Sequence, residues 1–271
     1  MAAAPPHSDR SARRVRRTRV RAAIAAGVVA ALAVGGIAGW ALLRDDAKAA
    51  PKKRAAAPST TITTTPKPVA AVTATQKVPE VTAYQDAVET SAAVTKLSAK
   101  TEYGLPRTFL VTDQSSRPGW LNVLLPVRPN GASGWIKATD VTLGTSDYEI
   151  RIELGAHKLT LLKLGQPVLD SGVVIGADKT PTPVGKFYVT DPLDLHSQPN
   201  AGYGVFALGI SGYSDVLTSF KGGPGQLAVH GTSNPGQVGQ NISNGCVRVP
   251  NDIIEQIAAQ APLGTPVTIV A

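Results

Sequence analysis

The C-terminal half of the chain alternates apolar and polar residues in short runs, as β-strands with one buried face do. In residues 148–154 every second side chain is apolar, so Tyr148, Ile150 and Ile152 share a face. Further apolar runs bounded by turn residues predict strands at 158–164, 168–175, 186–190, 227–230 and 267–270. We therefore expect residues 145–271 to form a β-sandwich with one or two helices.

One helix is predicted directly after Pro250. Asn251 can cap its start, and Gly264 follows its end. Its buried stripe at helical spacing consists of Ile253, Ile254, Ile257 and Ala258.

Residues 83–144 show shorter apolar runs, at 108–112, 119–125 and 134–137, separated by turn residues. About five short strands in this length predict a small barrel. The pair of segments GWLNVLLP and GWIKATDV resembles two neighbouring strands of bacterial SH3-like domains. We expect Trp120 and Trp135 to pack in the core or against the next domain, and a ligand groove is the alternative.

The pattern changes again toward the N-terminus. Residues 44–82 are rich in Ala, Thr and Pro and lack an amphipathic period, which predicts an extended linker. Residues 22–43 form an uncharged apolar run of 22 residues, enough to cross a bilayer as a helix. The arginine-rich segment 1–21 before it predicts a cytoplasmic tail with the rest of the chain outside. Cleavage of a signal peptide near Ala49 is the competing interpretation.

The net charge of +8 does not indicate nucleic-acid binding, because it belongs to the N-terminus. Residues 1–54 carry +9, residues 55–144 carry +2, and residues 145–271 carry −3. A nucleic-acid-binding domain would place its basic residues on the folded part. We therefore expect no nucleic-acid partner.

The chain has a single cysteine, Cys246, in the segment Ser243-Asn-Gly-Cys-Val-Arg. An unpaired cysteine in an exported protein is either a reactive thiol or a small buried hydrophobe. A predicted strand ends at His230, and a glycine-rich loop connects it to Cys246. If this loop brings the imidazole beside the thiol, His230 can take the thiol proton, and the two groups then share the charge as an ion pair. Gly245 allows a close turn whose N–H groups can face an oxyanion.

These residues resemble the L,D-transpeptidase catalytic domain, or YkuD domain, of the actinobacterial type with an SH3-like domain ahead of it. His230 and Ser243-Asn-Gly-Cys-Val-Arg match its catalytic motif, and Lys179-Thr-Pro-Thr-Pro-Val-Gly-Lys-Phe-Tyr matches its TPTP signature. The segments 202–208 and 209–213 are similar to those that line its acceptor and donor sides. One departure is Asn244, where the family has a second histidine. Because the resemblance assigns the base to His230, we expect Asn244 to orient the site without carrying protons.

The resemblance implies a cysteine acyltransferase of peptidoglycan biosynthesis, active at the cell wall from a membrane anchor at 22–43. Cys246 attacks a donor stem tetrapeptide, D-alanine leaves, and an acceptor amine resolves the thioester into a 3–3 cross-link. An L,D-carboxypeptidase with the same dyad and a non-catalytic wall-binding scaffold are the alternatives. Carbapenems are expected inhibitors, and no cofactor or metal is expected. The orienting residues are Ser243, Asn244, Gly245 and Gly231, and the backbone carbonyl of Gly231 is the expected partner of the other imidazole nitrogen of His230. The substrate-binding residues are Arg248, Tyr203, Tyr213 and Phe206.

Overall fold

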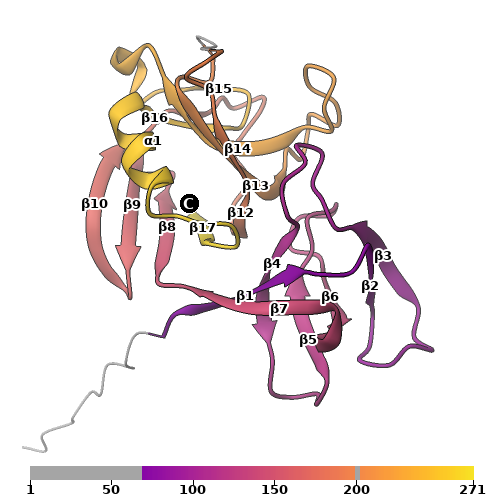
Figure 1. Ribbon diagram of the computed structural model, residues 1–271. Coiled ribbons are helices and arrows are strands. Elements are labelled where there is room, and N and C mark those ends of the chain that lie inside the picture. The colour runs from indigo at the N-terminus through magenta and orange to yellow at the C-terminus, as the bar shows by residue number, and fades with distance from the viewer. Residues whose placement is uncertain (1–68, 199–201) are drawn as a thin grey trace, which may run out of the picture. The chain divides into compact units, whose positions relative to one another are not determined.

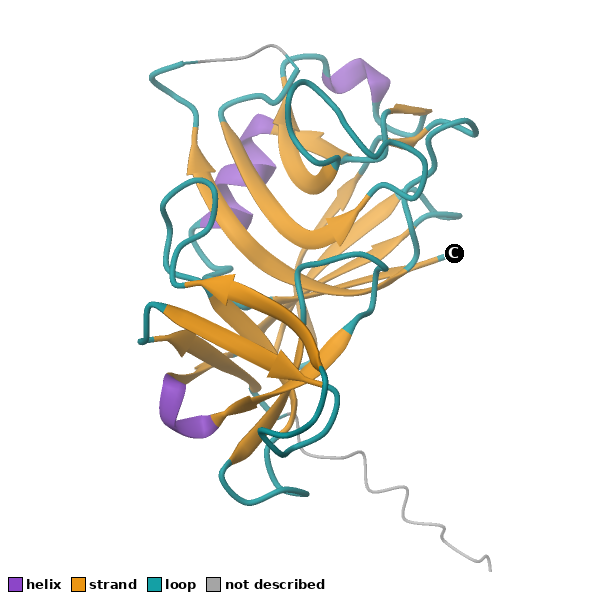
Figure 2. Cartoon of the chain, turned by 90° about the vertical axis from the view of Figure 1, so that its right-hand side faces the viewer, coloured by secondary structure: helices purple, strands orange, loops and turns teal. Residues whose placement is uncertain are grey.

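The computed structural model describes residues 69–198 and 202–271. The predicted cytoplasmic tail (1–21), the predicted membrane segment (22–43) and most of the predicted linker lie outside these residues. No helix in the described part of the chain is long and apolar enough to cross a bilayer. The described chain is almost entirely β-structure, with one α-helix and two short 3-10 turns (Figure 2).

The N-terminal unit is a seven-stranded antiparallel sheet in the order β3-β2-β6-β5-β4-β1-β7 (Figure 1). The core of the unit is apolar and includes Phe109, Val123 and Ile136, each fully buried. The strands are β1 (Ala71–Gln76), β2 (Glu80–Tyr84), β3 (Ala93–Ser98), β4 (Thr108–Asp113), β5 (Trp120–Leu124), β6 (Ser133–Lys137) and β7 (Val141–Ser146).

The predicted linker extends too far, because its last residues, 71–82, contain all of β1 and the start of β2. Ala74 and Val81 are fully buried in the core of the unit. The Ala- and Thr-rich composition was misleading here, since Thr is β-branched and small side chains fill a tight sheet interface. The unit therefore has seven strands instead of about five.

The two tryptophan segments are neighbouring strands, as predicted: β5 pairs with β6, and Asn122 lies opposite Trp135. The tryptophans are half-buried and lie outside the apolar core, so the expectation of core packing is wrong. Trp120 instead meets the ring of Tyr84 edge-on, with ring centroids 5.8 Å apart. The resemblance of the unit to SH3-like domains stays a prediction.

The C-terminal unit contains one mixed eight-stranded sheet in the order β10-β9-β8-β17-β12-β13-β14-β16, and a separate pair, β11 with β15. Both ends of this sheet contribute to one apolar core, from Ile150 and Leu159 on one side to Val229 and Val247 on the other. This shared core agrees with the predicted sandwich. The strands are β8 (Tyr148–Glu153), β9 (Lys158–Lys163), β10 (Gln166–Gly172), β11 (Ile175–Gly176), β12 (Gly185–Asp194), β13 (Phe206–Tyr213), β14 (Gln226–Thr232), β15 (Asn241–Ser243), β16 (Val247–Pro250) and β17 (Pro266–Val270).

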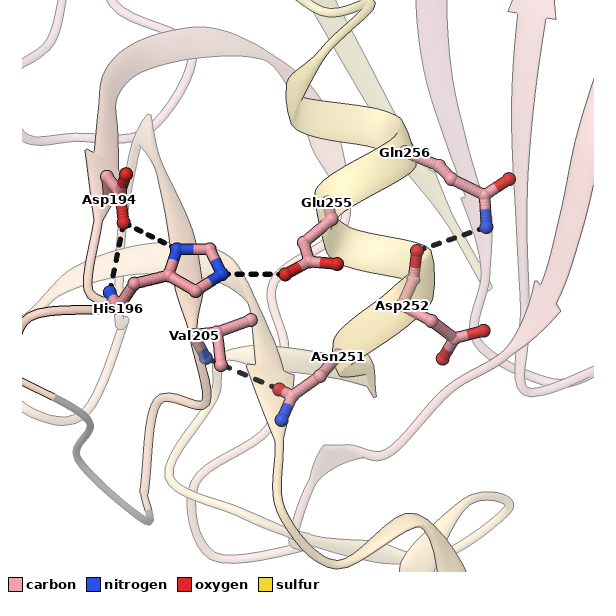
Figure 3. Close-up of polar contacts among 7 residues, drawn as sticks. All are labelled: Asp194, His196, Val205, Asn251, Asp252, Glu255 and Gln256. Atoms are coloured by element: carbon pink, nitrogen blue, oxygen red, sulfur yellow. Dashed lines mark hydrogen bonds and ion pairs between the residues drawn. The ribbon is translucent and has the colours of Figure 1, made fainter.

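Helix α1 (Asn251–Ala258) follows β16 directly and packs on β13, β14 and β16 (Figure 1). Ile254 and Ile257 are fully buried, which confirms the predicted stripe. The predicted cap is wrong, because the N-cap position is Pro250 and no side chain caps the helix. The side-chain oxygen of Asn251 instead accepts a hydrogen bond from the backbone N–H of Val205 at 3.3 Å (Figure 3).

Candidate active site

Cys246 lies in the tight turn that joins β15 to β16. The hydroxyl of Ser243, fully buried, donates to the carbonyl oxygen of Cys246 at 2.6 Å and accepts from the N–H of Gly245 at 3.1 Å. Gly245 has a φ of 109°, a conformation that favours glycine. These contacts close the turn internally and leave the thiol partly exposed at its tip.

The TPTP segment supports this turn from beneath. The hydroxyl of Thr180 donates to the carbonyl of Ser243, and that of Thr182 donates to the carbonyl of Gly245, both at 2.9 Å. Thr182 also accepts the N–H of Gly176 at 2.9 Å. The two threonines therefore hold the backbone of residues 243–245, which directly precede Cys246.

The parallel pairing of β14 with β16 brings His230 beside this turn. His230 lies opposite Arg248, and its side chain is only 2% exposed. Its Nδ1 lies 2.8 Å from the carbonyl oxygen of Gly231, the partner predicted from the sequence. Because a carbonyl can only accept, Nδ1 carries the proton in the neutral ring, and Nε2 is then the nitrogen that can act as a base. The backbone carbonyl of Tyr203 is a second hydrogen-bond partner of the imidazole.

Burial keeps both members of the dyad uncharged in the resting site. It lowers the pKa of His230 from 6.5 to about 4, with the Arg248 charge lowering it further and the Gly231 hydrogen bond opposing the shift. Burial also raises the pKa of the Cys246 thiol, against the effects of a hydrogen bond from Ala228 and of Arg248. Both shifts oppose the ion pair expected from the sequence, so proton transfer has to accompany attack.

Cys246 opens onto two cavities. The larger, about 380 Å³, extends from the thiol past Tyr203 and Gln226 to Tyr103 of the N-terminal unit. The smaller, about 100 Å³, contains His230 and is also lined by Gly202, Tyr203, Phe220, Lys221, Asn244 and Arg248. A substrate carbonyl placed at the thiol therefore has room on both sides of the scissile bond.

A family model describing the YkuD L,D-transpeptidase catalytic domain matches residues 147–269. YkuD of Bacillus subtilis (strain 168), a protein named as an L,D-transpeptidase, is 30% identical over 125 residues, which cover 46% of this chain and 67% of that protein. This chain belongs to the L,D-transpeptidase family.

A second relative of the same name, from Bacillus licheniformis, is 29% identical over 127 residues, covering 46% of this chain and 67% of that protein. Among solved structures, an L,D-transpeptidase of Enterococcus faecium is 20% identical and covers 46% of this chain, with a TM-score of 0.36. The present chain spans 50% of that structure.

Not every orienting residue predicted from the L,D-transpeptidase motif can contact substrate. The hydroxyl of Ser243 and the N–H of Gly245 both donate hydrogen bonds inside the turn, so neither donates to an oxyanion. Their role is to hold Cys246 in place. Asn244 is exposed and lines the smaller cavity. Its amide can therefore reach a bound group, and its orienting role stays a prediction.

The predicted substrate-binding residues divide into two groups. Tyr203 and Arg248 line the site, and the Nε of Arg248 is buried without a hydrogen-bond partner. Phe206 packs against the apolar core instead. Tyr213 donates its hydroxyl to the carbonyl of Pro126 at 2.9 Å, in the contact with the N-terminal unit, so both predictions are wrong for the catalytic cavities.

The sequence did not predict Lys221 or the packing role of Asn251 at the site, because their neighbours there are distant in sequence. The ring of Tyr203 lies 4.9 Å from that of His230, and Lys221 Nζ lies 5.2 Å from the Tyr203 ring centroid. Asn251 fills the space beside Gly204 and Gly231, where an added Cβ would come within 2.2 Å and 2.3 Å of its Oδ1. Asn251 thus connects the segment around Gly204 and Val205 to the start of α1.

His196 forms hydrogen bonds with two carboxylates. Its Nδ1 lies 2.7 Å from Asp194 and its Nε2 2.7 Å from Glu255 of α1 (Figure 3). These hydrogen bonds, first that of Asp194, raise the pKa of His196. Across the described residues, no three His, Cys, Asp or Glu side chains gather so as to hold a metal ion.

Proposed function

We propose that the chain forms 3–3 cross-links in peptidoglycan through a thioester on Cys246, with release of D-alanine. One observation carries this proposal: the half-buried Cys246 and the buried imidazole of His230, whose Nδ1 is held by a backbone carbonyl, line one cavity at the junction of β14 and β16. Cysteine acyl transfer requires these groups in this state.

In the acylation step, Nε2 of His230 takes the Cys246 proton while Sγ attacks the donor carbonyl. The backbone N–H of Cys246 is the group of the turn that can face the oxyanion. The exposed side chain of Asn244 can orient the bound donor without stabilising that charge. The C–N bond to D-alanine then breaks, and His230 returns the proton to the leaving nitrogen. The product is a thioester on Cys246.

In the second step, an acceptor amine occupies the place left by D-alanine. His230 takes a proton from its nitrogen as this attacks the thioester, and the C–S bond breaks. The thiol regains its proton from His230. The leaving and entering amines both need His230, which favours the smaller cavity for both and the larger cavity for the donor's acyl part.

Intact-mass measurement of residues 69–271 tests the nucleophile. Incubation with a carbapenem should add one drug mass to the wild type and none to Cys246→Ser, because a hydroxyl is far harder to ionise than a thiol. Equal adducts on both proteins, or none on either, would remove Cys246 from this role. Folding of the variant is checked by its thermal unfolding.

Incubation of the same protein with a stem tetrapeptide tests the outcome of the thioester. A transpeptidase should release D-alanine and give a dimer of the stem peptide. Free tripeptide as the sole product would show that water resolves the thioester, and the enzyme would then be an L,D-carboxypeptidase. Unchanged tetrapeptide would favour the non-catalytic scaffold.

We also propose that residues 22–43 anchor the protein in the cell membrane with the catalytic unit outside. The proposal is supported by the apolar run of 22 residues and the arginines before it. A reporter fused after Ala271 should be active only outside the cytoplasm. Recovery of a mature form that starts near Ala50 would instead show a cleaved signal peptide.

A further inference from the structure

A third cavity, of about 170 Å³, lies where the N-terminal unit meets the catalytic unit, and the proposed reaction does not use it. Its walls come from the loop before β4 on one side and from β12, β13 and β14 on the other. The polar side chains that line it include Glu102, Tyr103, Arg107, Asp191, Tyr213 and Gln226.

Asp191 is the feature of this cavity that requires an explanation. Its side chain is only 2% exposed, and its Oδ2 accepts one hydrogen bond, from Gln226 at 3.2 Å. Its Oδ1 is buried without a partner, and no ion pair with Asp191 occurs among the residues that the structure describes. Burying a carboxylate in this way is costly unless a cation or a donor completes it.

The surrounding charges leave the cavity acidic. Glu102 adds a second carboxylate, whereas the guanidinium of Arg107 is directed into its own loop. Arg107 donates from Nε to the carbonyl of Ser98 at 2.7 Å and from Nη2 to that of Lys100 at 3.0 Å. The hydroxyl of Tyr188, close enough for Asp191 to affect its pKa, is also buried without a partner.

This acidic cavity adjoins the larger cavity at Cys246, because Tyr103 and Gln226 line both. Gln226 is held by three acceptors, the hydroxyl of Thr190, the carboxylate of Asp191 and the carbonyl of Ile210, at the boundary that the two cavities share. A side chain that extends through the larger cavity away from His230 would therefore reach this boundary, beside Asp191.

We propose that Asp191, assisted by Glu102, binds the side-chain ammonium of the donor residue whose carbonyl Cys246 attacks. This inference rests on the proposed function, and it makes the junction with the N-terminal unit part of donor selection. A primary ammonium offers three donors and a positive charge, which suit an unpartnered carboxylate oxygen and nearby hydroxyls.

The test compares three donor tetrapeptides that differ only in the third side chain: lysine, Nε-acetyl-lysine and norleucine. The first-turnover formation of the Cys246 thioester is followed by mass spectrometry in residues 69–271. The wild type should acylate the lysine peptide about tenfold faster or more, in kcat/KM, than the two uncharged peptides. Asp191→Asn should reduce this preference to near one while still acylating the norleucine peptide.

Two further variants keep the result interpretable. Asp252→Asn, on the exposed face of α1, is the matched control and should keep the wild-type preference. Glu102→Gln lies on an exposed loop, tests the same cavity without altering a buried group, and should lower the preference part of the way. Adduct formation with a carbapenem whose side chain carries no cation should be alike in all variants that fold.

The outcomes separate this inference from the proposed function. Equal acylation of all three peptides by the wild type would overturn the ammonium subsite and leave the acyl transfer intact. A preference that survives in both Asp191→Asn and Glu102→Gln would also overturn it. Failure of every peptide to acylate Cys246 would instead contradict the proposed function.

Discussion

Both β-rich units bury polar side chains beside an apolar core, but at different places: those of the N-terminal unit, such as Thr73, Gln76 and Thr108, do not line the cavities at Cys246. The N-terminal core is formed by apolar side chains such as Phe109, Val123 and Ile136. The catalytic unit has an apolar core too, but around its active site it also buries Thr182, His230 and Ser243. In the catalytic unit, the buried hydroxyls of Thr182 and Ser243 hold the backbone of the turn at Cys246 in one position.

The difference lies in what each burial contributes. An apolar side chain stabilises by the area it removes from water, in whatever direction it packs. A buried hydroxyl is directional, and its loss leaves partners without hydrogen bonds at about 1–3 kcal/mol each. The hydrogen bonds beneath Cys246 therefore fix geometry, and substitutions in the two units should affect different properties.

The largest expected effect is that of His230→Ala. Removing the base should slow acylation of Cys246 by about 10²–10⁴-fold. The rate of carbapenem adduct formation, measured by mass spectrometry, checks this. A strongly lowered unfolding midpoint would show that His230→Ala has also lost its fold. His230→Gln, which removes less side-chain volume from the same buried position, serves as the comparison.

The pH dependence of acylation should reflect the buried state of the same histidine. Because the pKa of His230 is lowered to about 4, its Nε2 should remain a base well below pH 6.5, and acylation should fall only as the pH drops through about 4. The folded state resists protonation, so the stability that neutral His230 contributes is present above 6.5 and is lost as the pH falls toward 4. An acidic limb of kcat/KM near 6.5 would contradict this assignment.

A smaller and more selective effect is expected from Thr182→Val. The substitution leaves Gly176 N–H and Gly245 C=O without their hydroxyl partner, so the turn at Cys246 should loosen. We expect acylation to slow by about tenfold, together with a loss of about 1–3 kcal/mol in unfolding free energy.

The matched change in the other unit is Ile136→Val. It should cost about 0.5–1.5 kcal/mol of stability and leave acylation unchanged, because Ile136 packs only in the N-terminal core. Urea unfolding and adduct kinetics on both variants measure the two properties. Equal effects on acylation would erase the distinction between the units.

The smallest effect is expected at Asn244. Because its side chain is exposed and carries no proton in the reaction, Asn244→Ala should slow acylation only a few-fold, and Asn244→His should be tolerated. Adduct kinetics on the two variants provide the measurement. Inactivation of Asn244→Ala as complete as that of Cys246→Ala would give Asn244 a direct chemical role.

Local patterns predicted several strands of the catalytic unit, and they predicted the dyad, whose two members line one cavity in the structure. Alternation in residues 148–154 predicted β8, and the motif around Cys246 predicted both the nucleophile and the Gly231 partner of His230. Strand β1 was missed because Ala and Thr give a weak apolar signal, although Ala74 is fully buried.

The remaining site residues depend on contacts between distant segments. Tyr103 reaches the catalytic cavity from the other unit, and nothing near it in the sequence indicates this. Asn251 reads as a helix cap, and its contact with Val205 depends on how α1 packs. The segments around Phe206 and Tyr213 were recognised, but the sequence did not show which of their side chains face the cavity.

The parallel pairing of β14 with β16 has a consequence for how the enzyme tolerates change. Sheet hydrogen bonds, rather than the chain between them, set the distance from His230 to Cys246. The exposed residues 233–236 can therefore vary in length without moving either group. A peptide tag or a fluorescent label could be inserted there. It would lie near the active site and leave the rate of acylation unchanged.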